Sequence, residues 1–161
     1  MEDVTELKKQ AEELKRSSGK LAAEAERLMA EHLSLVKKAR TFKAKASNSS
    51  KMRDECAREA AHSDQKADVW KGQHDDRKSK DALNLNNERN QMHMHSQAAK
   101  GMRVREKRAE SESIKLKKMA DECNEKASIQ KKKSASMWRE SHKEYELYVG
   151  IMNKISRMER E

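Results

Sequence analysis

A seven-residue spacing of apolar side chains constrains the fold of this chain more than any other feature. One series of positions starts at Leu7 and a second starts at Val4, so that most heptads up to Trp70 carry two apolar sites. Two apolar positions per heptad are typical of a coiled coil and predict long α-helices. The first series is Leu7, Leu14, Leu21, Leu28, Leu35, Phe42, Cys56 and Trp70, and the second is Val4, Ala11, Ala25, Ala39, Ala46, Ala60 and Ala67, followed later by Met102, Ala109, Leu116, Cys123, Met137, Ile151 and Met158.

The composition also favours helices over a compact globule. Charged residues make up 40% of the chain and aromatic residues 3%, which leaves too little apolar surface for a broad core. A disordered chain of this composition would have no reason to keep a heptad spacing. Proline is absent, although an average usage of about 5% would supply about eight. We therefore predict an all-α fold.

An asparagine-rich segment, residues 84–90, is the best candidate for a bend. Asparagine is weak in helices and tolerates turn conformations, because its side chain competes for backbone groups. A reversal there predicts a long antiparallel two-helix coiled-coil hairpin that forms a single elongated domain over residues 1–161. Its first arm would span about residues 2–83, its bend about 84–87 and its second arm about 88–161.

This bend fixes a register in which Leu21 faces Ile151 and Trp70 faces Met102. Apolar residues then meet apolar residues at most layers of the hairpin. Two other all-α arrangements remain open: a parallel coiled-coil dimer of straight helices, and an elongated three-helix bundle with turns at residues 47–50 and 98–101. The continuous heptad phase and the matching of the two arms favour the hairpin.

The residues that often form catalytic or metal sites have no suitable spacing here. Cys56 and Cys123 occupy seam positions, where cysteine acts as a small apolar filler and stays reduced inside a cell. His93 and His95 are two residues apart and point to different faces of a helix, and no spacing resembles a zinc site. A two-helix hairpin also offers no concave pocket. We expect no metal, no other cofactor, no small-molecule substrate and no enzymatic activity.

The chain contains no apolar run near the ~18 residues that span a membrane, and its acidic N-terminus does not resemble a signal peptide. A cytoplasmic protein that does not bind membranes is therefore expected.

Positive charge is the strongest indication of function. The net charge is +9, and residues 100–133 hold 12 lysines and arginines against 6 acidic residues. Such a segment attracts phosphate backbones without reading bases. The predicted nucleic-acid-binding residues surround the second helix and are Lys100, Arg103, Arg105, Lys107, Arg108, Lys115, Lys117, Lys118, Lys131, Lys132 and Lys133.

Three short phrases carry a resemblance to a known group of proteins. They are MRDECAREA at residues 52–60, KADVW at residues 66–70 and ADECNEKA at residues 120–127. They resemble units that recur in long archaeal coiled-coil proteins, which are similar to the yeast nuclear segregation protein, a coiled-coil factor associated with ribosomes and messenger ribonucleoprotein. Cysteine stands here where that pattern has leucine. The resemblance implies no catalytic residues and a ribosome or RNA partner.

Charge and resemblance together predict a non-enzymatic protein that binds structured RNA, or the surface of a ribosome or ribonucleoprotein, through its basic segment. The alternative is a scaffold that binds proteins, or a homodimer assembled through the apolar chain ends, with no nucleic acid involved. In that case the positive charge would only keep the protein soluble.

Overall fold

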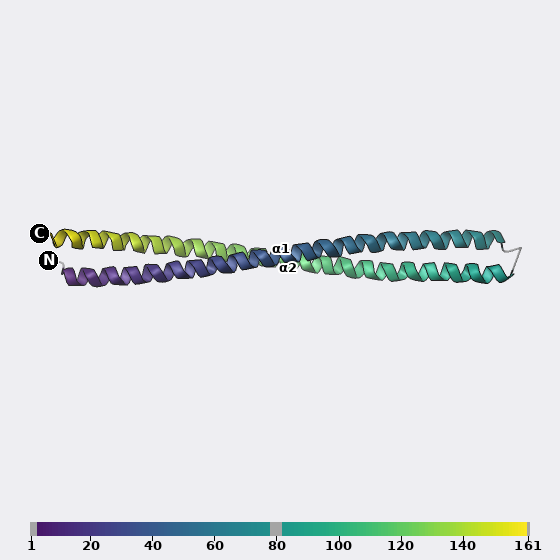
Figure 1. Ribbon diagram of the computed structural model, residues 1–161, viewed down its shortest axis with the longest axis horizontal. Helices are drawn as coiled ribbons and strands as arrows, with labels where there is room; N and C mark the ends of the chain where they lie inside the picture. The colour runs from purple at the N-terminus through teal and green to yellow at the C-terminus, as the bar shows by residue number, and fades with distance from the viewer. Residues whose placement is uncertain (1–2, 78–81, 161) are drawn as a thin grey trace. The chain divides into compact units, whose positions relative to one another are not determined.

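The computed structural model describes residues 3–77 and 82–160 and contains two long helices. Helix α1 spans Val4–Arg77 and helix α2 spans Ala82–Met158. The two helices pack against each other in an antiparallel helical hairpin, which confirms the predicted fold class (Figure 1). Residues 47–50 and 98–101 lie inside α1 and α2, so neither forms the turn that a three-helix bundle would need.

The first turn of α1 is capped by Asp3. Its carboxylate oxygen Oδ1 accepts a hydrogen bond of 3.0 Å from the backbone N–H of Thr5. Its carbonyl accepts one of 3.1 Å from the N–H of Leu7. An aspartate in this position satisfies amide groups that have no partner within the helix. Glu6 follows in the first turn, where its negative charge is favourable beside the positive end of the helix.

The hairpin consists of two compact units. The terminal unit is made of Met1–Ala39 and Asp121–Glu161, and the central unit of Arg40–Ala120. In the terminal unit the purple N-terminal part of α1 runs beside the yellow C-terminal part of α2 (Figure 1). In the central unit the later part of α1 runs beside the earlier part of α2.

Most of the buried positions of both helices are occupied by alanine and serine. The α1 row follows the predicted series that starts at Val4. The α2 row, by contrast, was not predicted, because alanine and serine carry little hydrophobic signal. The buried members of these rows are Ala11, Ser18, Ala25, Ala39, Ala46 and Ala60 on α1, and Ala99, Ser113, Ala120, Ala127, Ser134, Ser141 and Ile155 on α2. Small side chains at such contacts allow two helix axes to approach closely.

Hydrogen bonds from side chains to the opposite backbone fix the register of the terminal unit. The hydroxyl of Ser141 donates to the carbonyl of Ser18 at 2.9 Å, and that of Ser134 donates to the carbonyl of Ala25 at 2.8 Å. One heptad further along, Nδ1 of His32 lies 2.8 Å from the carbonyl oxygen of Ala127. Each step of seven residues forward along α1 is therefore matched by seven residues back along α2.

The predicted register, in which His32 would face Glu140, is wrong: Nδ1 of His32 lies beside the carbonyl of Ala127, which is 13 residues (140 − 127) earlier on α2, or about 20 Å along the helix. Ile151 lines a surface hollow with Leu14 and Ser17 instead of facing Leu21. In the central unit, Arg103 forms an ion pair with Asp64, which places its neighbour Met102 beside that part of α1 and away from Trp70.

The predicted bend at residues 84–87 is also wrong, because α2 is helical from Ala82 onward. Helix α1 ends at Arg77, and the connecting residues 78–81 lie outside the described part of the chain. The weak helix propensity of asparagine, a fraction of a kcal/mol per residue, does not outweigh the packing of a long helix against its neighbour.

Candidate nucleic-acid interface

The eleven sequence-predicted basic residues all lie on α2 and are all exposed. The structure nevertheless divides them between the two units. Lys131, Lys132 and Lys133 belong to the terminal unit. The other eight belong to the central unit and are Lys100, Arg103, Arg105, Lys107, Arg108, Lys115, Lys117 and Lys118.

Helix α1 adds basic residues that the sequence did not indicate. The hydroxyls of Ser50 and Ser113 are hydrogen-bonded at 2.8 Å, and the Ser113 hydroxyl also donates to the carbonyl of Ala46 at 3.1 Å. These bonds place residues 40–60 of α1 beside residues 100–120 of α2. The exposed basic residues of this part of α1 are Arg40, Lys43, Lys45, Lys51 and Arg58.

We call these thirteen exposed residues, five on α1 and eight on α2, the basic surface. Residues 40–60 and 100–120, which contain it, hold 14 lysines and arginines against 6 acidic residues. Residues 61–99 of the same unit hold 6 of each, and the terminal unit holds 17 against 16. The central unit therefore carries almost the whole net charge of the protein, concentrated on one stretch of both helices.

Few charges of the basic surface are neutralised by ion pairs. Arg103 pairs with Asp64 across the two helices. Within residues 3–77 and 82–160, none of its other lysines and arginines has an acidic partner at ion-pair distance. Positive side chains that extend into solvent without such partners remain available for external phosphate groups.

Arg53 lies within the same stretch but is already engaged. It is half-buried and donates to Oδ1 of Asp54 through both Nε, at 3.0 Å, and Nη2, at 2.9 Å. This hydrogen bonding, together with the charges of Asp54, Glu110 and Glu106, raises the pKa of Arg53. We therefore leave Arg53 out of the basic surface.

Aromatic side chains do not accompany the basic surface. Phe42 is the single aromatic residue of residues 40–60 and 100–120, and it is half-buried. Proteins that bind single strands stack bases on exposed aromatic rings. The basic surface can therefore attract a phosphate backbone through charge, but it has no platform for unstacked bases.

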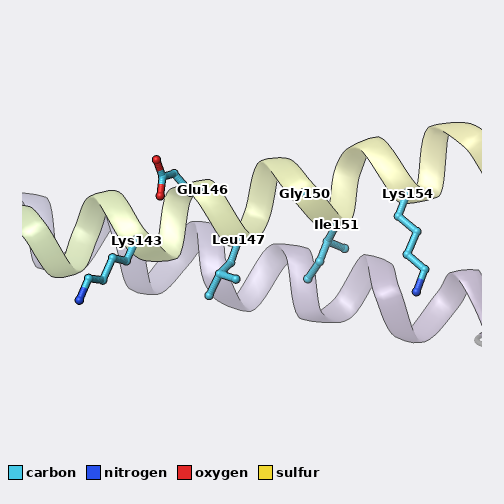
Figure 2. Close-up of a pocket in the computed structure, with 6 residues that line it drawn as sticks. All are labelled: Lys143, Glu146, Leu147, Gly150, Ile151 and Lys154. Atoms are coloured by element: carbon cyan, nitrogen blue, oxygen red, sulfur yellow. The ribbon is translucent and has the colours of Figure 1, made fainter.

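The terminal unit has a shallow groove along one face of α2. Lys143, Glu146, Leu147, Gly150, Ile151 and Lys154 line it. Leu147 and Ile151 point toward α1, whereas Glu146 points away from it (Figure 2). The groove is open along one helix face and contains no set of converging catalytic groups among the side chains that the figure labels.

Two buried titratable side chains lie close together in the central unit. His74 is 7% exposed and Glu88 is 2% exposed, with Nδ1 of the histidine 3.6 Å from Oε2 of the carboxylate. Among the described residues, no group of three or more His, Cys, Asp and Glu side chains is arranged to hold a metal ion. Cys56 and Cys123 are free thiols. No helix in the described ranges is long and apolar enough to cross a membrane.

Comparisons with known proteins identified no related protein. No family model matches the chain, and neither a curated protein nor a solved structure is significantly similar to it.

Proposed function

We propose that this protein is a non-enzymatic, cytoplasmic coiled coil that binds structured RNA, or the RNA of a ribosome or ribonucleoprotein surface, through the basic surface of its central unit. The observation that carries the proposal is the concentration of exposed, mostly unpaired lysines and arginines on adjacent stretches of two helices. Residues 52–60, 66–70 and 120–127 resemble units of long archaeal coiled-coil proteins, which are similar to a coiled-coil factor associated with ribosomes, and this resemblance suggests the same class of partner.

The physical basis of binding is the release of counterions from the phosphate backbone. Each phosphate that a lysine or arginine neutralises makes the fall of log K with log salt concentration steeper by about 0.9 for a duplex. A helix with basic residues on its outer faces can follow such a backbone without inserting side chains between bases. Structured RNA is recognised largely in this way, through its shape and its phosphates.

Titration of a base-paired RNA hairpin at several salt concentrations tests the proposal. We expect the affinity to fall steeply between about 50 and 200 mM salt, because several phosphate contacts contribute. The triple variant Lys51→Glu, Lys115→Glu, Lys117→Glu should weaken binding at low salt. It should also make the slope of log K against log salt concentration shallower by about 2 to 3.

The control variant makes the same change in net charge in the terminal unit. Lys126→Glu, Lys132→Glu and Lys133→Glu alter three exposed lysines outside the basic surface. This variant should retain most of the affinity. An equal loss in both variants would show that only net charge matters, and absence of RNA binding by the wild type at low salt would overturn the proposal outright.

A further inference from the structure

Helix α2 carries a second row of apolar side chains that does not face α1. Trp138, Tyr145 and Met152 are spaced by seven residues and are 43%, 51% and 38% exposed. Val149 lies three residues before Met152 and is 38% exposed, and Ala135 lies three residues before Trp138 and is exposed. Alternating steps of three and four residues are the spacing of a coiled-coil seam.

This row is separate from the seam that already holds the hairpin together. In the same stretch of α2, the contacts with α1 use the buried residues Ser134, Ser141 and Ile155. His142, the one polar member of the second row, pairs with Glu146 on the surface at 3.2 Å. A helix with two seams is built to pack against two neighbours, and α1 packs against the first of these seams.

The adjacent surface of α1 carries lysines beside Met152 and apolar side chains further along, toward Trp138. Lys8 pairs with Glu159 at 2.7 Å, and Lys15 lines one hollow together with Met152. Steps of seven residues along α1 lead from Lys15 to Met29 and then to Val36. In the register of the Lys15 and Met152 contact, Met29 lies beside Trp138, and both Met29 and Val36 are half-buried.

The charges at the two ends of the row favour a second copy of this chain as its binding partner. Lys131 and Glu159 lie two heptads to either side of Tyr145, and both are exposed. In an antiparallel pair of α2 helices with its two-fold axis at Tyr145, Lys131 of each copy approaches Glu159 of the other, which within its own copy also pairs with Lys8 at 2.7 Å, and Trp138 meets Met152. A two-fold interface must be self-complementary in this way, and a sulfur atom beside an aromatic ring is a favourable contact.

The distribution of charge also favours a second copy of this chain. The terminal unit holds 17 basic and 16 acidic residues, whereas the central unit holds 20 and 12. Two copies can therefore meet through their terminal units with little electrostatic repulsion, but not through their basic surfaces.

We propose that the face formed by Ala135, Trp138, Tyr145, Val149 and Met152 docks a second copy of this chain in antiparallel orientation. The terminal units then form a four-helix assembly, in which the exposed aromatic side chains become buried. The inference does not depend on RNA binding.

Sedimentation of the full chain, treated with nuclease and measured over a range of concentrations, tests the interface. We expect a dimer for the wild type. The variant Trp138→Glu, Tyr145→Glu should raise the dissociation constant at least about 100-fold, because it places charges at the centre of the apolar row. Circular dichroism should show unchanged helicity, since both positions lie outside the hairpin seam.

Two matched variants place glutamate on other faces of α2 in the same unit. Ile129 is 52% exposed and Leu147, in the groove of Figure 2, is 60% exposed. Ile129→Glu and Leu147→Glu should both remain dimeric. A wild type that stays monomeric at high concentration would overturn the proposal, and so would loss of the dimer in Leu147→Glu but not in the Trp138 and Tyr145 variant.

A charge exchange tests the antiparallel orientation. Glu159→Lys is made together with Lys8→Glu, so that the ion pair within each copy is kept with opposite polarity. Lys131→Glu alone and this Lys8 and Glu159 exchange alone should each weaken the dimer by about 10-fold, because each removes two symmetry-related exposed ion pairs between the copies. The combined variant should recover most of that loss, since the pairs between the copies then form with opposite polarity. Failure of the combined variant to recover would overturn the antiparallel arrangement.

Discussion

Buried serines have a specific role in this hairpin. Ser113, Ser134 and Ser141 are at most 5% exposed, and each donates its hydroxyl hydrogen to a carbonyl of the opposite helix. A buried hydroxyl without a partner would be destabilising, but here the donor is satisfied by a group that lies close because the side chains between the helices are small. Serine therefore replaces alanine at this seam without opening a gap.

Replacing Ser134 by alanine tests this role. Ser134→Ala removes the 2.8 Å bond to the carbonyl of Ala25 and should lower the free energy of unfolding by about 1 kcal/mol. Urea denaturation measures the change. The control Ser136→Ala alters an exposed serine of the same helix and should change the value by less than about 0.5 kcal/mol. Equal effects of the two substitutions would contradict the account.

On the solvent side of α1, Arg27 joins two acidic residues of its own helix. It donates from Nε to Glu24 at 2.9 Å and from Nη1 to Glu31 at 2.6 Å. Hydrogen bonding from Arg27, aided by its charge, lowers the pKa of Glu24 below the ordinary value of 4.5. Because the pKa in the folded state is lowered, the pair contributes stability above the unfolded pKa, and that contribution is lost as the pH falls through the folded pKa.

The variant Arg27→Ala should raise the pKa of Glu24 toward its ordinary value. Titration of the side-chain carboxyl carbon by NMR measures the shift directly. Arg16→Ala, an exposed arginine elsewhere on α1, should leave the Glu24 titration unchanged. The assignment to Arg27 fails if Glu24 titrates identically in the wild type and in Arg27→Ala.

For the helices, the heptad pattern predicted the fold class and the inner face of α1. Leu7, Ala11, Ala25 and Leu28, all members of the two predicted series, are among its most buried residues. The pattern could not predict the register, because a heptad repeat matches itself again after every seven residues. The asparagine-rich segment therefore decided between registers, and its residues are helical in the structure.

The inner face of α2 was predicted only in part. The row that includes Met102, Leu116 and Met137 is half-buried, whereas the row of small residues that includes Ala120 and Ser134 is fully buried. A search for large apolar side chains passes over such a row. A search for alanine and serine at intervals of seven residues would have found it and, with it, the register.

Disulfide cross-linking distinguishes the two registers. In a background with Cys56→Ser and Cys123→Ser, the pair Ala25→Cys, Ser134→Cys should oxidise readily, because these positions face each other. The pair Ala25→Cys, Leu147→Cys would face each other in the predicted register, but Leu147 lies 13 residues (147 − 134) beyond Ser134, about 20 Å along α2 and out of reach of a disulfide. Faster cross-linking of the second pair would show that the helices adopt the predicted register and not the observed one.

For the whole molecule, the central unit carries the charge and the terminal unit carries the exposed aromatic residues. The sequence predicted the α2 part of the basic surface, because lysines and arginines cluster there along the chain. The α1 part, including Lys45 and Lys51, belongs to a segment distant in sequence, so only the correct register could place it beside Lys115. Lys131 was predicted as part of an RNA site, and the structure places it in the other unit.

The two proposals predict that RNA binding and self-association can be abolished separately. The variant Lys51→Glu, Lys115→Glu, Lys117→Glu should lose RNA affinity and remain dimeric. The variant Trp138→Glu, Tyr145→Glu should become monomeric. Its affinity for a short RNA, counted per hairpin, should depend on salt as that of the wild type does. Anisotropy and sedimentation of both variants measure the two properties. Loss of both properties in either variant, with helicity intact, would show that they are not independent.

The alanine and serine rows also have an evolutionary consequence. Exchange between these two residues adds or removes a single oxygen atom, so descendants of this protein can drift between them while the helices stay in contact. Growth to leucine or methionine would force the backbones apart and would be rejected. Divergent copies would therefore preserve the interval between small residues long after their identities had changed.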